Sequence, residues 1–171
     1  MVIAEPVTER EIWGRHMGST GRLEHIHITG KASGAMLPLD EVLLVAGKGI
    51  EGDRYFLGTG TYSMKPGPDR QVTLIEREVL EALARDHGIE LTPEQHRRNL
   101  TVSGVALNHL VGRRFRVGAV LLETVRLNQP CKYLEKMTGK AVYLPLLNRS
   151  GLNCRIVEGG AIRPGDAVTP A

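Results

Sequence analysis

Glycine and proline divide this chain into short pieces, and that punctuation limits the folds it can adopt. The 171 residues include 20 glycines and 9 prolines. The pieces between them are rich in Val, Ile, Leu and Thr, which favour extended strands, and turn residues bound most of them. A further short strand is expected between two tight turns in the stretch GGAIRPGDAV. The other predicted strands are 22–29, 41–47, 70–76, 99–104, 119–127, 141–147 and 152–158.

Helical patterns are fewer than strand patterns. Residues 77–88 carry apolar side chains at helical spacing, and Gly88 can end that helix in the left-handed conformation. Residues 92–98 open with a capping-box pattern, and shorter helices are predicted at 107–112 and directly after Cys131. Many short strands with few helices do not alternate as β-α-β units. The sequence therefore predicts a mainly β, mostly antiparallel, barrel-like domain with a few short helices.

Composition and charge exclude several classes of function. Hydrophobic residues make up 42% and charged residues 24%, as in ordinary soluble proteins. The opening MVIAEPVTER has charges where a signal peptide needs an apolar run, and no apolar stretch is long enough to cross a bilayer. We therefore expect a cytoplasmic protein without a membrane partner. The net charge of +3 fits an anionic ligand, but scattered basic residues and 4% aromatics argue against nucleic acid as a partner.

The two cysteines have different surroundings. In the predicted strand 152–158, Cys154 shares a face with Leu152 and Ile156, so we expect it to pack in the core as a small hydrophobic residue. Cys131 instead follows Pro130 and precedes a short helical run. Amide groups at the start of that helix favour a thiolate, which is both a nucleophile and a soft metal ligand. The alternative for Cys131 is packing beneath the start of the helix.

Five segments, in consistent order, resemble the MOSC domain, a family named after the C-terminal domain of molybdenum cofactor sulfurases. They are GIEGDRYF (49–56), RQVTLIE (70–76), RRNLTVSGVALNHLVGRRFRVG (97–118), QPCKYLE (129–135) and GLNCRIVEGGAIRPGD (151–166). The resemblance begins near residue 22, so we expect an N-terminal lead segment at 1–21 and a MOSC domain at 22–171, of the stand-alone bacterial type. It implies a MOSC-type β-barrel-like fold.

The resemblance also implies a cofactor. MOSC domains are associated with the molybdenum cofactor (molybdopterin), a pterin-dithiolene with an anionic phosphate, and Cys131 matches the family's cysteine after a proline. That cysteine ligates molybdenum in the amidoxime-reducing relatives, which reduce N-hydroxylated compounds. In the sulfurases, the domain accompanies a pyridoxal-phosphate-dependent desulfurase. The resemblance thus implies a molybdenum-cofactor-binding protein acting through Cys131, as a sulfur carrier or as a molybdenum-dependent oxidoreductase. The alternative is a non-catalytic cofactor-binding or storage module, so enzymatic activity stays open.

The expected partner is a cysteine desulfurase for a carrier, or a separate electron-transfer protein for a reductase. Two departures from the family bear on mechanism. Many members have histidine where this chain has Tyr55, and many carry a second cysteine where it has Asn128. Resolution of a persulfide by a neighbouring cysteine is therefore in doubt.

Five further residues are expected to form the cofactor pocket: Asp53, Arg54, Arg98, Asn99 and Arg155. The guanidinium groups of Arg54 and Arg98 suit an anionic phosphate, and Asn99 can exchange hydrogen bonds with a pterin edge. Arg155 projects opposite Cys154 and either reaches the same pocket or faces solvent. The alternative for Asp53 and Arg54 is a solvated turn with a surface ion pair. Arg97 is expected on the solvent side of the helix predicted at 92–98.

Overall fold

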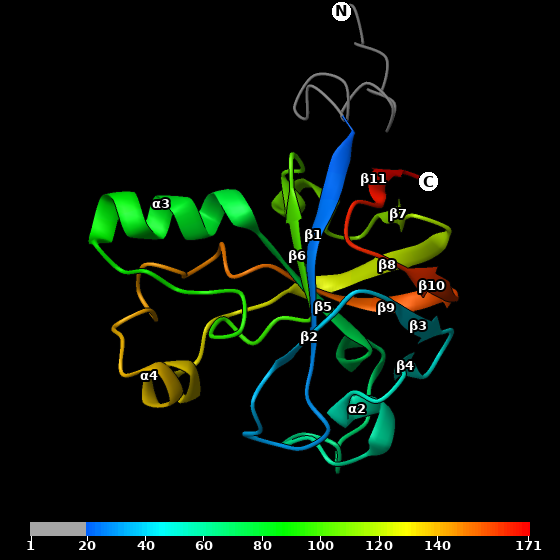
Figure 1. Cartoon of the computed structure of the whole chain (residues 1–171), viewed down its shortest axis with the longest axis horizontal. Coiled ribbons are helices and arrows are strands. Elements are labelled where there is room, and N and C mark those ends of the chain that lie inside the picture. The colour runs from blue at the N-terminus through cyan, green and yellow to red at the C-terminus, as the bar shows by residue number, and fades with distance from the viewer. Residues whose placement is uncertain (1–19) are drawn as a thin grey trace, which may run out of the picture.

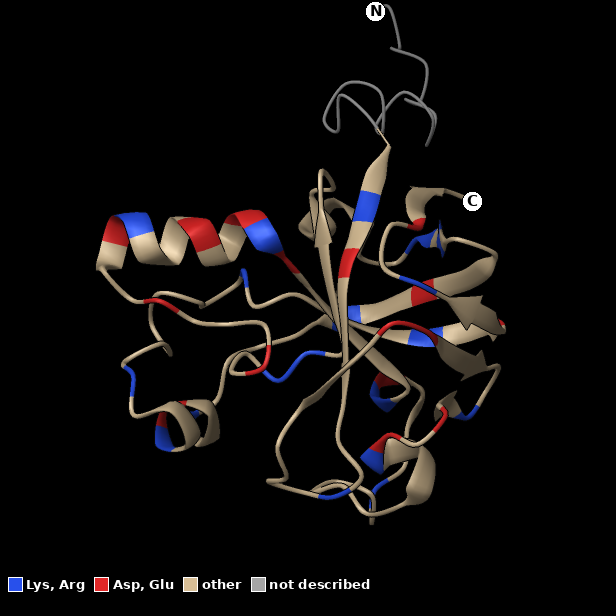
Figure 2. Ribbon diagram, in the orientation of Figure 1, with Lys and Arg blue, Asp and Glu red and all other residues tan. Residues whose placement is uncertain are grey.

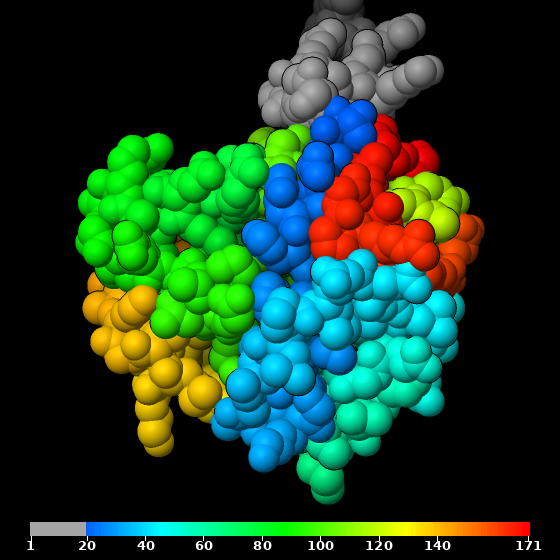
Figure 3. Space-filling model, in the orientation of Figure 1, coloured from blue at the N-terminus to red at the C-terminus, as the bar shows by residue number. Residues whose placement is uncertain are grey.

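Seven strands close into a barrel, which confirms the mainly β prediction (Figure 1). The computed structural model describes residues 20–171. Going round the barrel, the strands are β11 (Ala167–Pro170), β7 (Arg114–Val117), β8 (Val120–Leu127), β9 (Leu152–Glu158), β5 (Val72–Glu76), β6 (Leu100–Ser103) and β1 (Gly21–Ile28). The pairing of β1 with β11 completes the circle, and Figure 3 shows these first and last described segments side by side.

Smaller elements extend the barrel. Strand β2 (Leu37–Leu39) pairs with β1, and β10 (Gly160–Ile162), β3 (Val42–Val45) and β4 (Gly49–Ile50) form a second sheet. All pairings are antiparallel except β5 with β6, which the helix α3 (Arg77–His87) connects. The remaining helices are α2 (Arg54–Leu57), α4 (Lys132–Thr138) and short 3₁₀ helices at Pro68–Arg70 and Leu107–Leu110.

Two apolar clusters hold these elements together. The larger fills the barrel, where side chains alternate along each strand; Leu152, Cys154 and Ile156 of β9 all point inward. The smaller lies outside the barrel and joins α3 to α4 and the segment after it. Its members are Val79, Leu83, Leu91, Leu134, Val142 and Leu146. Because Leu134 belongs to it, this cluster fixes α4 and the residue just before α4, Cys131.

Two element predictions are wrong. Residues 141–147 form turns rather than a strand, because Val142 and Leu146 turn into the smaller cluster and the Leu146 N–H donates to the Val142 carbonyl at 3.1 Å. Residues 92–98 form a turn rather than a helix. The predicted cap contact exists, since the Thr92 N–H donates to Gln95 Oε1 at 3.1 Å, but Arg97 adopts a left-handed backbone with φ of 63°.

Some elements had no clear signal in the sequence: β2, β4, β7 and α2. Of the lead segment predicted at 1–21, residues 1–19 lie outside the described residues, and Gly21 already belongs to β1. Among residues 20–171, no helix has the length and apolar character needed to span a membrane.

Gly151 provides a test of the fold, because its position tolerates no side chain. Its φ is 99°, and a Cβ atom there would lie 1.8 Å from the Leu74 carbonyl oxygen. We expect Gly151→Ala to lower the free energy of unfolding by more than about 3 kcal/mol, since backbone strain and the steric clash add together. The control is Gly112→Ala, where φ is 74° and nothing lies within 4 Å; strain alone should cost about 1–2 kcal/mol. Equal losses in urea unfolding would contradict this account.

Candidate functional site

A basic cavity of about 340 Å³ lies between α4 and the segment that follows α2. Its walls carry Cys131 and a single carboxylate, Asp69. They also carry five arginines: Arg54, Arg70, Arg97, Arg98 and Arg126. Elsewhere basic and acidic residues are interspersed, as along α3 in Figure 2. The excess of positive charge in this cavity favours an anionic ligand.

Cys131 is exposed at the wall of this cavity. It occupies the position before α4, and its carbonyl accepts a hydrogen bond from the buried Leu134 at 3.0 Å. Pro130, on its other side, is buried. The backbone at Cys131 is therefore fixed while its sulfur remains accessible, which excludes the alternative of packing beneath the helix. Cys154 differs: it is fully buried, and burial raises the pKa of its thiol to about 12.

Arg98 presents a guanidinium held by three hydrogen bonds. Nε donates to the Ser150 carbonyl at 3.1 Å, one terminal nitrogen to Ser150 Oγ at 2.6 Å and the other to the His96 carbonyl at 3.2 Å. Within residues 20–171, no carboxylate pairs with it. Desolvation lowers the pKa of Arg98 to about 10, although nearby Cys131 opposes the shift and Arg54 reinforces it. The group stays protonated at neutral pH, so a cation without a counter-charge faces the cavity.

His96 supports Arg98 from behind. Its Nδ1 accepts the Arg98 N–H at 2.9 Å, so the neutral ring carries its proton on Nε2, which donates to Thr101 Oγ1 at 2.9 Å. Burial holds the pKa of His96 well below its ordinary value, and the charge of Arg98 acts in the same direction. The ring therefore remains a neutral acceptor that fixes the backbone of Arg98.

Arg97 also faces the cavity, so its expected place on the solvent side of a helix is wrong. In extended backbone, the side chains of Arg97 and Arg98 would point in opposite directions. The left-handed φ of 63° at Arg97 breaks that alternation, so both side chains line the same hollow. A terminal nitrogen of Arg97 donates to the Gly34 carbonyl at 2.8 Å. Burial lowers the pKa of Arg97, and the nearby charge of Arg54 adds to that effect.

Asp53 and Asn99 lie behind the cavity wall and hold Arg54 from there. Both side chains are buried, and Asn99 Nδ2 donates to Asp53 Oδ1 at 3.2 Å. Asp53 caps α2 by accepting the Tyr55 N–H at 3.2 Å, and it accepts from Arg54 at 3.3 Å. Asn99 Oδ1 accepts from the Thr73 hydroxyl at 3.0 Å. These partners engage both side chains, so Arg54 is the member of this group that lines the cavity.

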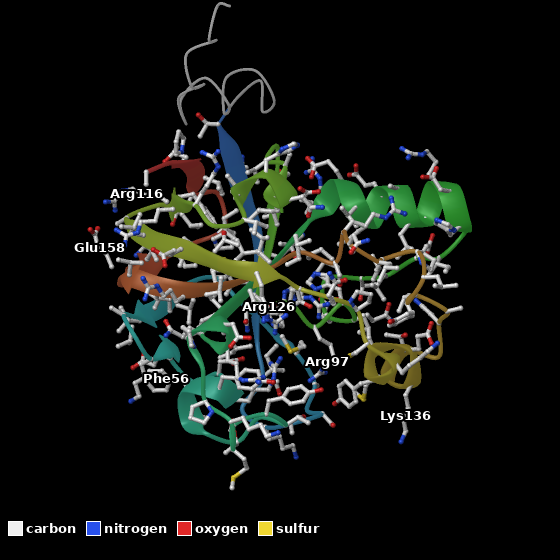
Figure 4. All side chains as sticks on the ribbon, turned by 180° about the vertical axis from the view of Figure 1, so that it is seen from behind. Phe56, Arg97, Arg116, Arg126, Lys136 and Glu158 are labelled. Carbon is white, nitrogen blue, oxygen red and sulfur yellow. The ribbon has the colours of Figure 1, made fainter. Side chains whose placement is uncertain are left out.

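The structure does not bring Arg155 to the cavity. Arg155 lies opposite Glu123 in the pairing of β8 with β9, and the two form an ion pair at 2.7 Å. The residue of β9 that lines the cavity is Asn153, whose side-chain amide donates to the Asp69 carbonyl at 2.7 Å. Figure 4 shows two of the arginines that do line it, Arg126 near the middle of the view and Arg97 closer to α4.

Aromatic side chains concentrate at the cavity, which the sequence did not indicate. Three of the chain's four tyrosines, Tyr55, Tyr62 and Tyr133, line it. The guanidinium carbons of Arg54 and Arg70 lie 4.9 Å from the ring centres of Tyr55 and Tyr62. Such contacts fix the planes of the guanidinium groups. The cavity thus combines flat apolar faces with oriented cations.

Thiol labelling tests the contrast between the two cysteines. Because Cys131 is exposed and Cys154 is buried, about one thiol per chain should react rapidly with Ellman's reagent in the folded protein. Cys131→Ser should abolish this fast reaction, whereas Cys154→Ala should leave it in place. Two fast thiols, or none, would contradict the burial described here.

The pH dependence of stability tests the buried His96. An unfolded histidine, with its ordinary pKa near 6.5, binds a proton before folded His96 does. The free energy of unfolding should therefore fall as the pH drops below about 6.5, by at most about 1.4 kcal/mol per pH unit for this group. Burial also lowers the pKa of His27, so this residue likewise lowers the free energy of unfolding as the pH drops.

The variant His96→Asn should weaken this dependence, because Oδ1 of Asn can still accept the Arg98 N–H but does not titrate. Urea unfolding at pH 7.5 and 5.5 measures the difference. The control is His87→Asn, at an exposed position. An unchanged pH dependence in His96→Asn would exclude His96 as its source.

The comparisons with known proteins agree with this fold. No curated protein matches the sequence. Among solved structures, the YuaD protein from Bacillus subtilis superposes with a TM-score of 0.73 at 21% identity, covering 88% of this chain and 94% of its own. YiiM from Escherichia coli superposes with a TM-score of 0.64 at 21% identity, covering 88% of this chain and 69% of its own. YiiM from Geobacillus stearothermophilus superposes with a TM-score of 0.64 at 18% identity, covering 88% of this chain and 75% of its own.

At these identities the structural likeness establishes the fold alone. The family model of the MOSC domain, however, matches residues 61–169 of the sequence itself. That range takes in β5 to β9, Arg98 and Cys131. MOSC domains are associated with the molybdenum cofactor. The chain belongs to the MOSC domain family.

Proposed function

We propose that this protein binds the molybdenum cofactor in the basic cavity and reduces N-hydroxylated compounds, with Cys131 as the ligand that the protein gives to molybdenum. One observation carries the proposal: an exposed thiol and several oriented guanidinium groups line the same hollow. Among residues 20–171, no carboxylate forms an ion pair with Arg97 or Arg98. A ligand that is both anionic and able to bind sulfur through a metal satisfies both features.

The arginines near Cys131 suit the phosphate of the cofactor. Arg98 is fixed by Ser150 and His96, and Arg97 is fixed by the Gly34 carbonyl, so neither needs to reorganise on binding. Burial is the main cause of the lowered pKa values of Arg97 and Arg98, and repulsion from the charge of Arg54 adds to it. A phosphate would relieve that repulsion. We assign the phosphate to these three residues.

The donor set also suits a metal that arrives with its own ligands. In the described part of the chain, no three His, Cys, Asp or Glu side chains lie close enough to hold a metal ion. Cys131 would be the one thiolate that the protein adds to the ligands that the metal brings with its cofactor. When bound, the group would supply the two-electron redox chemistry that removal of oxygen from an N–OH substrate requires. The N–OH substrate, two electrons and two protons then give the N–H product and water.

The residues of this chain hold the reactants. Arg54, Arg97 and Arg98 bind and orient the anionic end of the cofactor, and α4 keeps the sulfur of Cys131 at the cavity wall. Asp53 accepts a hydrogen bond from the guanidinium group of Arg54, and Asn99 in turn donates to Asp53 from the interior. The two electrons are assigned to a separate electron-transfer protein.

Cofactor content tests the proposal directly. We expect protein from a cofactor-producing host to contain molybdenum and pterin. Arg98→Gln should weaken cofactor retention by about 10- to 100-fold, because charge-assisted hydrogen bonds are lost, and Cys131→Ala should lose molybdenum. Arg155→Gln is the matched control and should retain both. Absence of pterin from the wild type would refute cofactor binding, and retention by Cys131→Ser with unchanged metal content would favour a storage module.

Turnover separates the reductase from the sulfur carrier. The loaded protein should reduce benzamidoxime to benzamidine with an artificial electron donor, and Cys131→Ala should not. The exposure of Cys131 also favours the carrier as a second candidate, since an accessible thiol can accept sulfane sulfur as a persulfide. Loaded protein without turnover, but with a persulfide on Cys131 after treatment with a pyridoxal-phosphate-dependent desulfurase and cysteine, would establish the carrier instead.

A further inference from the structure

A second cavity, of about 620 Å³, adjoins the first. The turn between β3 and β4, the helix α2 and the segment 63–71 bound it. Tyr55 and Arg70 line both cavities, so the two hollows meet at these side chains. Figure 4 shows Phe56, which lines the second cavity, on the α2 side of the molecule, and Arg97, which lines the first, toward α4.

The charged residues lining this second cavity are Lys48 and Arg70, both cations. Neither forms an ion pair with a carboxylate of residues 20–171. Lys48 is held against an aromatic face, with Nζ 4.0 Å from the ring centre of Phe56. Two cations on walls that also carry aromatic rings favour an anionic group attached to a flat apolar one.

Arg70 is oriented for an oxyanion. Its Nε donates to the Lys65 carbonyl at 2.8 Å, and its guanidinium carbon lies 4.9 Å from the ring centre of Tyr62. The 3₁₀ helix Pro68–Arg70 fixes its backbone just before β5 enters the core. Its two terminal nitrogens have no hydrogen-bond partner among the described residues. They can therefore donate together to two oxygens of a phosphate or carboxylate.

The two cavities differ in the cations that line them. Arg97 and Arg98 line the first cavity with Cys131, and they are absent from the second; Lys48 lines the second and is absent from the first. We propose that the second cavity binds the oxyanion end of an aromatic substrate, a phosphate or a carboxylate. Arg70 binds that oxyanion, and the reactive end of the substrate extends past Tyr55 toward Cys131. The identity of that reactive end rests on the proposed function; the oxyanion site does not.

Calorimetric titration of the purified protein tests this site. The probes are phenyl phosphate, benzoate and the neutral benzyl alcohol. We expect at least one anion to bind and benzyl alcohol not to bind, with the tighter anion identifying the source of the oxyanion. Arg70→Gln should weaken anion binding by about 10- to 100-fold, through the loss of charge-assisted hydrogen bonds. Lys48→Gln should weaken it less, and Arg85→Gln, an exposed control on α3, should not change it.

Two results would overturn the proposal. One is that the wild type binds neither anion, and the other is that Arg70→Gln and Lys48→Gln both bind the anion as tightly as the wild type does. Lys48 is exposed, so its variant tests the site even if Arg70→Gln fails to fold. Pterin analysis gives an independent check. Lys48→Gln, at a residue that lines the second cavity alone, should retain as much pterin as the wild type, and a lower content would overturn the assignment by giving the second cavity to the cofactor. If the wild-type protein contained no pterin, the proposed function would be refuted. The titration with phenyl phosphate and benzoate would still decide whether the second cavity binds an oxyanion.

Discussion

The candidate site depends on Arg98, a cation that pairs with no carboxylate among residues 20–171. Arg98 is held by the carbonyl groups of Ser150 and His96 and by the Ser150 hydroxyl, and none of these neutralises it. Removing a guanidinium from water is costly unless an anion compensates. The fold arranges rigid support around this group: His96 is kept neutral behind it, and the tightly packed Gly151 follows Ser150 into β9. The structure thus maintains an unsatisfied charge next to an accessible thiol.

Much of the scaffold could be predicted because its signals are local. Short segments rich in β-branched residues became β1, β5, β6, β8 and β9, and Gly88 in left-handed conformation ends α3 as expected. Alternation along one strand was enough to place Cys154 in the core. The proline before Cys131 and the helix after it likewise indicated a fixed backbone position, but they left open whether the sulfur is accessible. In each case, neighbours in sequence determine the outcome.

The rest depends on contacts between residues far apart in sequence. Segment 141–147 has strand-like composition, yet packing against α3 and α4 turns it into the smaller apolar cluster. Arg155 has the correct alternation for the cavity, but Glu123 on the neighbouring strand pairs with it instead. Arg97 reaches the cavity through a left-handed backbone that its sequence does not suggest. The tyrosines gather there from three separate segments, which no local pattern records.

The pairing of β1 with β11 has a consequence for how the protein is made. Gly21 lies opposite Val168, so the ring of strands joins the two ends of the described chain. During synthesis, β1 emerges from the ribosome early and must wait for β11 before the ring can close. Until then both edges next to the gap are unpaired and open to association with other chains. Any chaperone requirement of this protein should therefore centre on the interval between the release of β1 and the release of β11.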